Sequence, residues 1–155
     1  DGIVTVTDDE IAAAVLALLE KEKLVAEGAG ATAVAAAMFD KVDLNGKKTI
    51  CLVSGGNIDV GILSRVITRG LVMSGRNSSL TLKLADRPGQ LEAVSKIISD
   101  HGANVVSVLH SRIADHMQVN NCILKIGLET RNFDHVHEIE TALQQAGFEL
   151  VEDRS

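Results

Sequence analysis

The fold of this chain is decided by residues 80–91, which read LTLKLADRPGQL. Every second residue over 80–84 is leucine, which is the period of a strand with one buried face. Residues 86–89 are Asp-Arg-Pro-Gly, the composition of a turn, and the apolar spacing then changes to that of a helix. The apolar stripe of this helix is formed by Leu91, Val94 and Ile98. The stretch therefore predicts a strand, a turn and a helix that packs back against the strand.

The sequence that follows extends this pattern into a closed unit. Residues 104–113 and 119–130 have the pattern of two strands, which residues 114–118 join. An amphipathic helix comes next, ends at Gly147 and leads into a last strand over 148–151. The order is βαββαβ, a ferredoxin-like unit in which two helices cover one face of a four-stranded antiparallel sheet. Because such a sheet leaves edges and one face open, we expect the chain to form a homo-oligomer.

The composition excludes several classes of protein. The chain has 155 residues, of which 46% are hydrophobic, 23% charged and 2% aromatic, with a formal net charge of −6. One or two compact domains fit this composition, and disorder does not. No apolar run approaches the roughly 20 residues that cross a bilayer, so we expect no membrane span. An acidic chain without Trp or Tyr is poorly suited to bind nucleic acid.

The cysteines and the first residues suggest where the protein works. Cys51 and Cys122 lie in apolar stretches far apart in the sequence, which is neither a disulfide framework nor a metal-ligand spacing. A reducing, cytoplasmic compartment is therefore expected. The chain starts at Asp1 without a basic leader or a methionine, so we expect it to be cut from something longer.

The N-terminal half differs from the C-terminal half in its sequence pattern. Residues 73–79 are short, small and polar, which is typical of a linker, and we place the domain border near Gly75. Thr7 and Glu10 have the spacing of a capping box and predict the start of a helix that runs to about Lys23.

Two more helices and one strand are predicted in this half. Residues 29–39 are nearly all alanine and predict a helix buried on several sides. Residues 49–53 are apolar almost throughout, as in a strand covered on both faces of a parallel sheet. A further helix is expected over 58–69. Because one strand has no partner for a parallel sheet, this half is expected to be part of a larger α/β domain.

The candidate ligand-binding residues of this half are Ser54, Gly55, Gly56 and Asn57. They follow the predicted strand and precede the last of the three helices. Open α/β folds bind ligands at such a place, where the backbone N–H groups of a helix start face the ligand. The alternative is a tight turn without a ligand, because glycine pairs are common where the chain reverses sharply. The residues alone leave both interpretations open.

Four short motifs resemble known families. Residues 51–59, CLVSGGNID, and residues 27–31, EGAGA, resemble the end of the catalytic domain in threonine ammonia-lyases (threonine dehydratases) and serine racemases. These are pyridoxal-phosphate enzymes of the tryptophan-synthase-β fold type. Residues 86–91, DRPGQL, and residues 101–105, HGANV, resemble an ACT domain. The order of the motifs is similar to that of the shorter threonine ammonia-lyases.

The resemblance implies an α/β remnant of the catalytic domain over 1–74, followed by an α+β ferredoxin-like ACT domain over 75–155. It implies that the complete enzyme uses pyridoxal 5'-phosphate to convert L-threonine, or L-serine, with L-threonine giving 2-oxobutanoate and ammonia. The cofactor-bearing lysine motif and the tetraglycine phosphate loop of the family have no match here, so we expect the chain alone to be inactive. Two alternatives stay open: a non-catalytic amino-acid-binding or dimerisation module, and a serine dehydratase or racemase of the same fold type.

By the same resemblance, Ser54 donates a hydrogen bond to the pyridine nitrogen of the cofactor. A neutral hydroxyl suits an unprotonated ring nitrogen. Gly55 and Gly56 let the backbone approach the ring. Asn57 either contacts the ligand or caps the next helix, and Glu27 is either at the edge of the cofactor or a carboxylate at a helix start.

The C-terminal half contains a second candidate site, for an amino-acid effector. The turn at Asp86 precedes a helix whose first N–H groups, at Gly89, Gln90 and Leu91, are suited to bind a carboxylate. Asn104 of a paired subunit is expected to hold the amino group. A branched-chain effector, isoleucine or valine, is the expectation, and a surface that serves only for dimerisation is the alternative.

The five histidines do not predict a metal site. His135 and His137 are two residues apart on a predicted helix and point to nearly opposite sides. His101, His110 and His116 belong to separate elements, where a surface or turn position is the simpler interpretation. We therefore expect no metal ligands among them.

Overall fold

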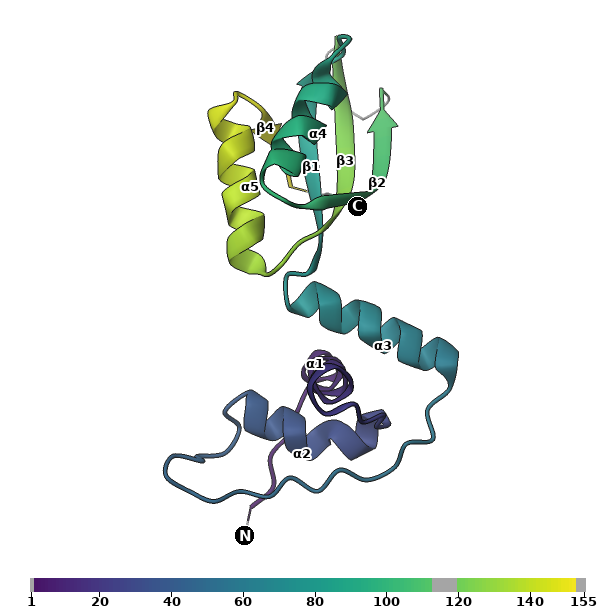
Figure 1. Ribbon diagram of the computed structural model, residues 1–155, viewed down its shortest axis with the longest axis vertical. Coiled ribbons are helices and arrows are strands. Elements are labelled where there is room, and N and C mark those ends of the chain that lie inside the picture. Colours follow the sequence, from purple (N-terminus) through teal and green to yellow (C-terminus); the bar gives the residue numbers. More distant parts are fainter. Residues whose placement is uncertain (1, 113–119, 153–155) are drawn as a thin grey trace. The chain divides into compact units, whose positions relative to one another are not determined.

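The computed structural model describes residues 2–112 and 120–152. The chain divides into two compact units, residues 1–74 and residues 75–155, which we describe separately (Figure 1). The predicted loop over 114–118, with His116, lies outside the described residues.

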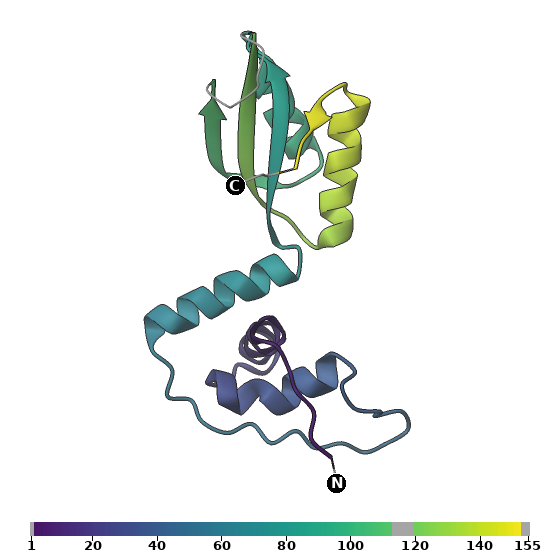
Figure 2. The same ribbon diagram turned by 180° about the vertical axis from the view of Figure 1, so that it is seen from behind.

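The C-terminal unit has the predicted order βαββαβ. Its elements are β1 (Asn77–Ala85), α4 (Gln90–Asp100), β2 (Asn104–Ser111), β3 (Asn121–Glu129), α5 (Phe133–Gln145) and β4 (Glu149–Leu150). They form a four-stranded sheet in the order β2-β3-β1-β4, and each neighbouring pair is antiparallel. Both helices lie on one face of this sheet (Figures 1 and 2). The ferredoxin-like prediction is confirmed.

The core of this unit follows from the register between β1 and β3. Leu82 lies opposite Leu124, and Leu84 lies opposite Cys122. Because directly opposed residues share a face, the alternating leucines of both strands point to the same side. Val94, Ile98, Ile139 and Leu143 of the two helices cover them, and all four are fully buried.

A buried histidine ties the end of α4 to the start of α5. The Nδ1 atom of His135 accepts a hydrogen bond from the backbone N–H of Arg131 at 3.1 Å. The Nε2 atom lies 2.8 Å from the carbonyl oxygen of His101, so the neutral ring carries its proton on Nε2 and donates it there. The prediction that His135 and His137 point to different sides of the helix is confirmed, since His135 is 1% exposed and His137 lies on the surface.

We predict that His135→Leu lowers the free energy of unfolding of the C-terminal unit by about 2–3 kcal/mol, because it leaves two backbone groups unpaired. Urea denaturation followed by circular dichroism measures this change. His137→Leu, on the exposed side of the same helix, is the matched control and is expected to be nearly neutral. Equal stability of the two variants would show that the paired ring contributes nothing.

The N-terminal unit begins with the capping box that the sequence predicts. The Thr7 hydroxyl accepts from the Glu10 N–H at 3.3 Å, and the Glu10 carboxylate accepts from the Thr7 N–H at 2.8 Å. The first helix, α1 (Asp8–Ala17), continues as the π-helical turn η1 (Leu18–Glu22) and stops at the left-handed residue Lys23. The predicted end at Lys23 is therefore right, although the last turn is wider than an α-helix.

Helices α2 (Gly28–Met38) and α3 (Val60–Met73) pack with α1 around a small core rich in alanine. α2 buries Gly30, Ala31 and Ala35, whereas Met38 is 46% exposed. Because Gly30 and Ala35 lie on different sides of the helix, burial on several sides is confirmed in part, with an exposed side at Ala29 and Thr32. No helix among the described residues is long and apolar enough to cross a membrane.

The strand predicted over 49–53 does not form. These residues carry no strand assignment, and Ile50 and Leu52 are 96% and 78% exposed, while Val53 packs on the core of the unit. The physical reason is that a strand needs a partner for its backbone N–H and C=O groups, and the described part of this unit contains helices and loops only. The described part of this unit therefore contains the apolar run but no sheet with which the run could pair.

Candidate functional site

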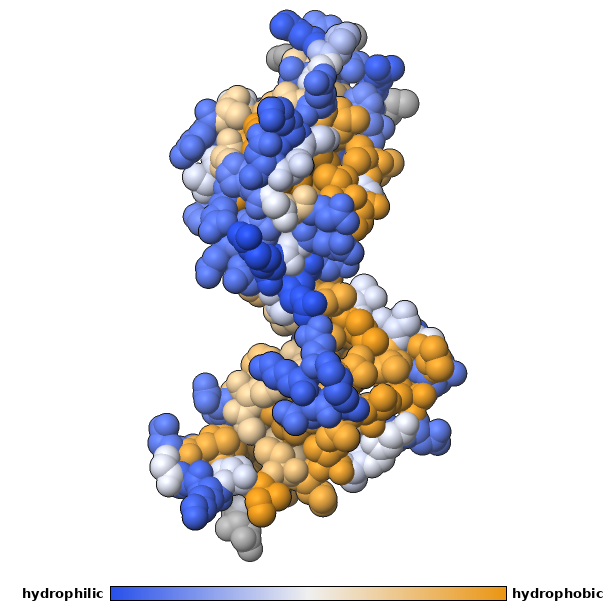
Figure 3. All heavy atoms as spheres, viewed as in Figure 1, coloured by the Kyte–Doolittle hydropathy of each residue, from blue (hydrophilic) through white to orange (hydrophobic). Residues whose placement is uncertain are grey.

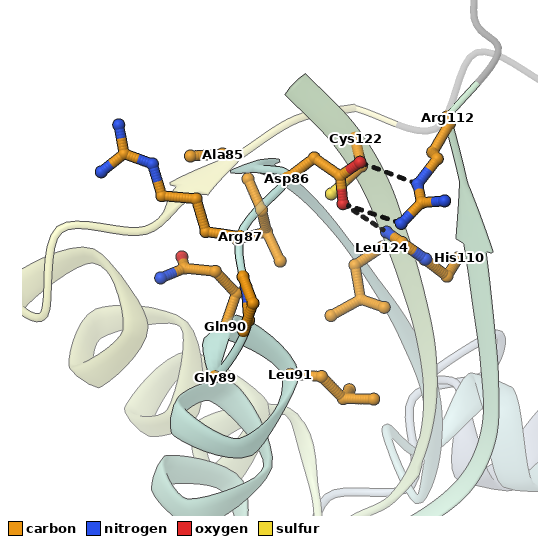
Figure 4. Close-up of a pocket in the computed structure, with 12 residues that line it drawn as sticks. Ala85, Asp86, Arg87, Gly89, Gln90, Leu91, His110, Arg112, Cys122 and Leu124 are labelled. Atoms are coloured by element: carbon orange, nitrogen blue, oxygen red, sulfur yellow. Dashed lines mark hydrogen bonds and ion pairs between the residues drawn. The ribbon is translucent and has the colours of Figure 1, made fainter. Parts of the chain in front are cut away.

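A pocket of about 390 Å³ lies in the C-terminal unit where β1 leads into α4 (Figure 4). The residues that line it are Leu84, Ala85, Asp86, Arg87, Pro88, Gly89, Gln90, Leu91, His110, Arg112, Cys122 and Leu124. They come from the end of β1, the turn over 86–89, the first turn of α4, the end of β2 with the residue after it, and the start of β3. The pocket therefore depends on the register of three strands.

That register explains which side chains meet. His110 of β2 lies opposite Leu124 of β3, and Cys122, two residues before Leu124, lies opposite Leu84 of β1. Residues two apart in a strand share a face, so these side chains point to the face that the helices cover. Asp86 continues the face of Leu84, and its N–H donates to the Asn120 carbonyl at 2.8 Å.

The polar side of the pocket is built around the Asp86 carboxylate. The Nε atom of Arg112 lies 2.7 Å from one of its oxygens, and Nε2 of His110 lies 3.9 Å from the other. In Figure 4 both side chains point toward Asp86, whereas Arg87 points away from it. Burial raises the pKa of the Cys122 thiol, and the negative charge of Asp86 adds to this effect.

The first turn of α4 forms the other side of the pocket. Gly89 is the N-cap residue with a φ of 87°, and no side chain caps the helix. The first backbone N–H groups of a helix lack partners within the helix and carry its positive end. Leu91 is 46% exposed and, with Leu124, gives this part of the pocket an apolar surface.

The structure brings together four of the five residues predicted for effector binding, since Asp86, Gly89, Gln90 and Leu91 all line this pocket. Asn104 does not line it in the same chain. It lies at the opposite end of β2, where its amide donates to the Glu129 carboxylate at 3.0 Å. Binding of an effector stays a prediction.

Sequence reasoning missed His110, Arg112 and Cys122 as pocket residues. None of them lies in a motif, and His110 was interpreted as a surface or turn residue. The signal was the strand period, because position 112, directly after β2, continues the alternation to which position 110 belongs. The strand period identifies these residues as pocket residues only when the pairing between β2 and β3 is known, and no local sequence pattern predicts that pairing.

The two N-terminal motifs also meet in space. The Glu27 N–H donates to the Gly55 carbonyl at 3.1 Å, so the turn after the apolar run packs on the start of α2. A Cβ atom on Gly30 would overlap the carbonyl oxygen of Ser54, and one on Gly55 would overlap the Glu27 carboxylate. Ser54 itself is exposed. The turn thus packs closely on the start of α2 and leaves the side chain of Ser54 exposed.

Asn57 does not cap the following helix, so that interpretation is wrong. The cap is Asp59, whose Oδ1 accepts from the N–H groups of Gly61 at 2.8 Å and Ile62 at 3.2 Å. The helix α3 accordingly starts at Val60, two residues later than predicted. Glu27 occupies the N-cap position of α2 without a side-chain cap bond, which places its carboxylate at a helix start. Cys51 is half-buried, and its thiol lies 3.6 Å from the Ala33 carbonyl.

We predict that Gly30→Ala displaces the turn at Ser54, at a cost of about 1–3 kcal/mol, because the new methyl group needs the space of a backbone carbonyl. Hydrogen exchange at the Glu27 amide, which the turn protects, should speed up. Gly28→Ala is the matched control, because its Cβ would meet only Ile11 at 3.5 Å. Unchanged exchange in Gly30→Ala would contradict this packing.

The C-terminal unit is a ferredoxin-like domain with a pocket of small-molecule size at the start of its first helix. Residues 78–146 match the family model of the ACT domain. Residues 1–56 match the model described as pyridoxal-phosphate dependent enzyme. The two matches follow each other along the chain, so the chain resembles part of such an enzyme domain followed by an ACT domain.

Two curated relatives align with nearly the whole chain. The L-threonine ammonia-lyase of Thermotoga maritima is 45% identical over 150 residues, which is 97% of this chain and 37% of that protein. The L-threonine ammonia-lyase of Geobacter sulfurreducens is 43% identical over 149 residues, 96% of this chain and 37% of that protein. The catabolic L-threonine dehydratase of Escherichia coli is 44% identical over 68 residues, 43% of this chain and 21% of that protein. The chain spans little more than a third of the first two relatives.

Proposed function

We propose that this chain is the C-terminal part of a pyridoxal-phosphate-dependent L-threonine ammonia-lyase. Residues 1–74 then belong to the catalytic domain, and residues 75–155 form its regulatory ACT domain. The observation that carries the proposal is the order of the two family matches, together with relatives of that name that align along almost the entire chain. The reaction proposed for the complete enzyme is the conversion of L-threonine to 2-oxobutanoate and ammonia, with L-serine as the other candidate substrate.

The exposed apolar run supports the first part of this proposal. Ile50 and Leu52 lie on an extended segment that has no strand partner among the described residues. Burying two such side chains would contribute about 1.5–3 kcal/mol each. A parallel sheet in the rest of a catalytic domain would cover them and pair their backbone. Orange side chains cover much of the visible face of residues 2–74 in Figure 3, which is consistent with missing neighbours.

The turn at Ser54 fits one edge of pyridoxal phosphate. The cofactor, when bound, withdraws electrons from the α-carbon of an amino acid. Ser54 is proposed to donate its hydroxyl proton in a hydrogen bond to the ring nitrogen, which keeps that nitrogen unprotonated. Gly55 and Gly56 are proposed to present their backbone to the ring, with Glu27 and Asn57 at its border. We infer that this chain alone is inactive, because it contains no counterpart of the family's lysine motif.

In the complete enzyme, Ser54→Ala should lower kcat/KM for L-threonine by roughly ten- to a hundredfold, because the ring nitrogen loses its hydrogen-bond donor. Steady-state kinetics and the absorption spectrum of the bound cofactor measure the effect. Ser64→Ala, an exposed serine on α3, is the control and should keep the activity of the parent. Parental kinetics and an unchanged spectrum in Ser54→Ala would remove Ser54 from the cofactor site.

For the ACT domain we propose a branched-chain amino-acid effector, isoleucine or valine. Its carboxylate would meet the N–H groups of Gly89, Gln90 and Leu91, and its ammonium group the Asp86 carboxylate. The apolar side chain would contact Leu91 and the inner wall of the pocket. The charge arrangement supports this assignment, because a helix start and a carboxylate face the same small space.

We propose that Asn104 reaches the site from a second copy of the chain. β2 is an edge strand of the sheet, and its Val106, Val108 and Leu109 are 45–63% exposed. Two β2 edges that pair antiparallel about the middle of the strand would set Asn104 of one copy opposite Ser111 of the other. The pocket residue His110 lies at that end of β2, and Arg112 follows directly after it. A homo-oligomer through this edge would therefore complete the site.

Leu91→Trp should abolish binding of isoleucine and valine, because the larger side chain fills the apolar part of the pocket. Titration calorimetry on the 155-residue chain measures the binding directly. Lys96→Trp, on the exposed side of the same helix, is the control and should bind like the parent. If neither amino acid gives binding heat with the parent chain, the effector proposal is wrong and the role of the ACT domain is dimerisation only.

A further inference from the structure

Three potential metal ligands from three different segments meet beside the pocket. They are the Asp86 carboxylate after β1, the imidazole of His110 on β2 and the thiol of Cys122 on β3. One ligand atom of each residue lies within 4.8 Å of those of the other two. Figure 4 shows the sulfur atom of Cys122 next to the carboxylate, with the His110 ring approaching from the other side. No sequence motif of the chain contains all three of these residues.

We propose that Asp86, His110 and Cys122 bind a divalent transition-metal ion of the zinc class. Carboxylate, imidazole and thiolate are the three ligand types that zinc takes in proteins, and the thiolate disfavours magnesium and calcium. On binding, the Cys122 thiol releases its proton to solvent and the sulfur forms the bond to the metal. The two anionic ligands then balance the charge of the ion.

The distances require only small movements. Bond lengths of about 2.0–2.3 Å place the ligand atoms of a tetrahedral zinc ion about 3.3–3.8 Å apart. Nε2 of His110 already lies 3.9 Å from an Asp86 oxygen. With all three ligand atoms within 4.8 Å of one another, a shift of about 1 Å completes the coordination triangle. The fourth position then opens into the pocket, where water can occupy it.

The backbone holds two of the three ligands rigidly. Cys122 is 2% exposed and lies opposite Leu84 in the ladder between β1 and β3. His110 lies opposite Leu124, on the same face as Cys122. Ligands on paired strands keep their spacing better than ligands on loops, which favours a defined site. Only Asp86, at the end of β1, belongs to a turn.

Arg112 is the competitor of the metal. Its guanidinium group lies 2.7 Å from the Asp86 carboxylate, and its side chain is 70% exposed. A metal ion must share this carboxylate or displace the guanidinium into solvent, which an exposed side chain permits at low cost. Removing the arginine charge should therefore strengthen metal binding, an effect opposite in sign to the loss of a ligand.

Titration of the reduced 155-residue chain with Co²⁺ tests the proposal. The expected result is one ion per chain, a sulfur-to-cobalt charge-transfer band and the intense visible bands of tetrahedral cobalt, all of which Zn²⁺ displaces. His110→Gln should weaken binding by more than about tenfold, and Cys122→Ala should remove the sulfur band. Arg112→Gln should tighten binding by about tenfold.

Matched controls separate the site from general affinity for thiols and imidazoles. Cys51→Ser removes the other cysteine, and His137→Gln removes an exposed histidine of α5; both should bind cobalt like the parent. His110 is exposed, so its variant should keep the circular dichroism spectrum of the folded chain. The proposal is overturned by the absence of a sulfur band, by equal weakening in Cys51→Ser, or by parental affinity in His110→Gln. No amino acid is present in this experiment, so its outcome is independent of the effector proposal.

Discussion

The antiparallel ladder between β1 and β3 is the constraint on which the C-terminal unit depends. It pairs nine residues of each strand, from Asn77 with Glu129 to Ala85 with Asn121. A slip of one residue would turn every leucine of one strand to the open face and leave the helices without a core. The same register sets Leu84 against Cys122 and brings Asp86 beside Cys122, and the pairing of β2 with β3 adds His110 to them. Core and pocket therefore both depend on the ladder between β1 and β3.

The predictable part of this unit is the part encoded in local periodicity. The alternation over 80–84, the turn before Gln90 and the helical spacing after it predicted the first three elements and four residues of the pocket, and the patterns over 104–151 predicted the other elements. His110 and Cys122 could not be found this way, because their proximity depends on which residues of β2 and β3 face each other. Long-range pairing is not contained in a short stretch of sequence.

In the N-terminal unit, too, local features could be predicted from the sequence and long-range pairing could not. The capping box at Thr7 involves groups three residues apart, and it forms as predicted. The strand over 49–53 needs partners from elsewhere, and here the run stays unpaired, with Ile50 almost fully exposed. Asp59 rather than Asn57 caps α3, a difference of two positions that spacing alone does not decide. The close approach of Gly30 to Ser54 nevertheless shows that the turn after the apolar run packs on the start of α2.

The most direct test of the account is a nuclear magnetic resonance titration of the labelled chain with isoleucine. If the pocket at the end of β1 receives an amino-acid carboxylate, the amide resonances of Gly89, Gln90 and Leu91 must show the largest saturable shifts. The resonances of the N-terminal unit should stay in place. Shifts confined to residues 2–74, or no saturable shift at the start of α4, would contradict the account.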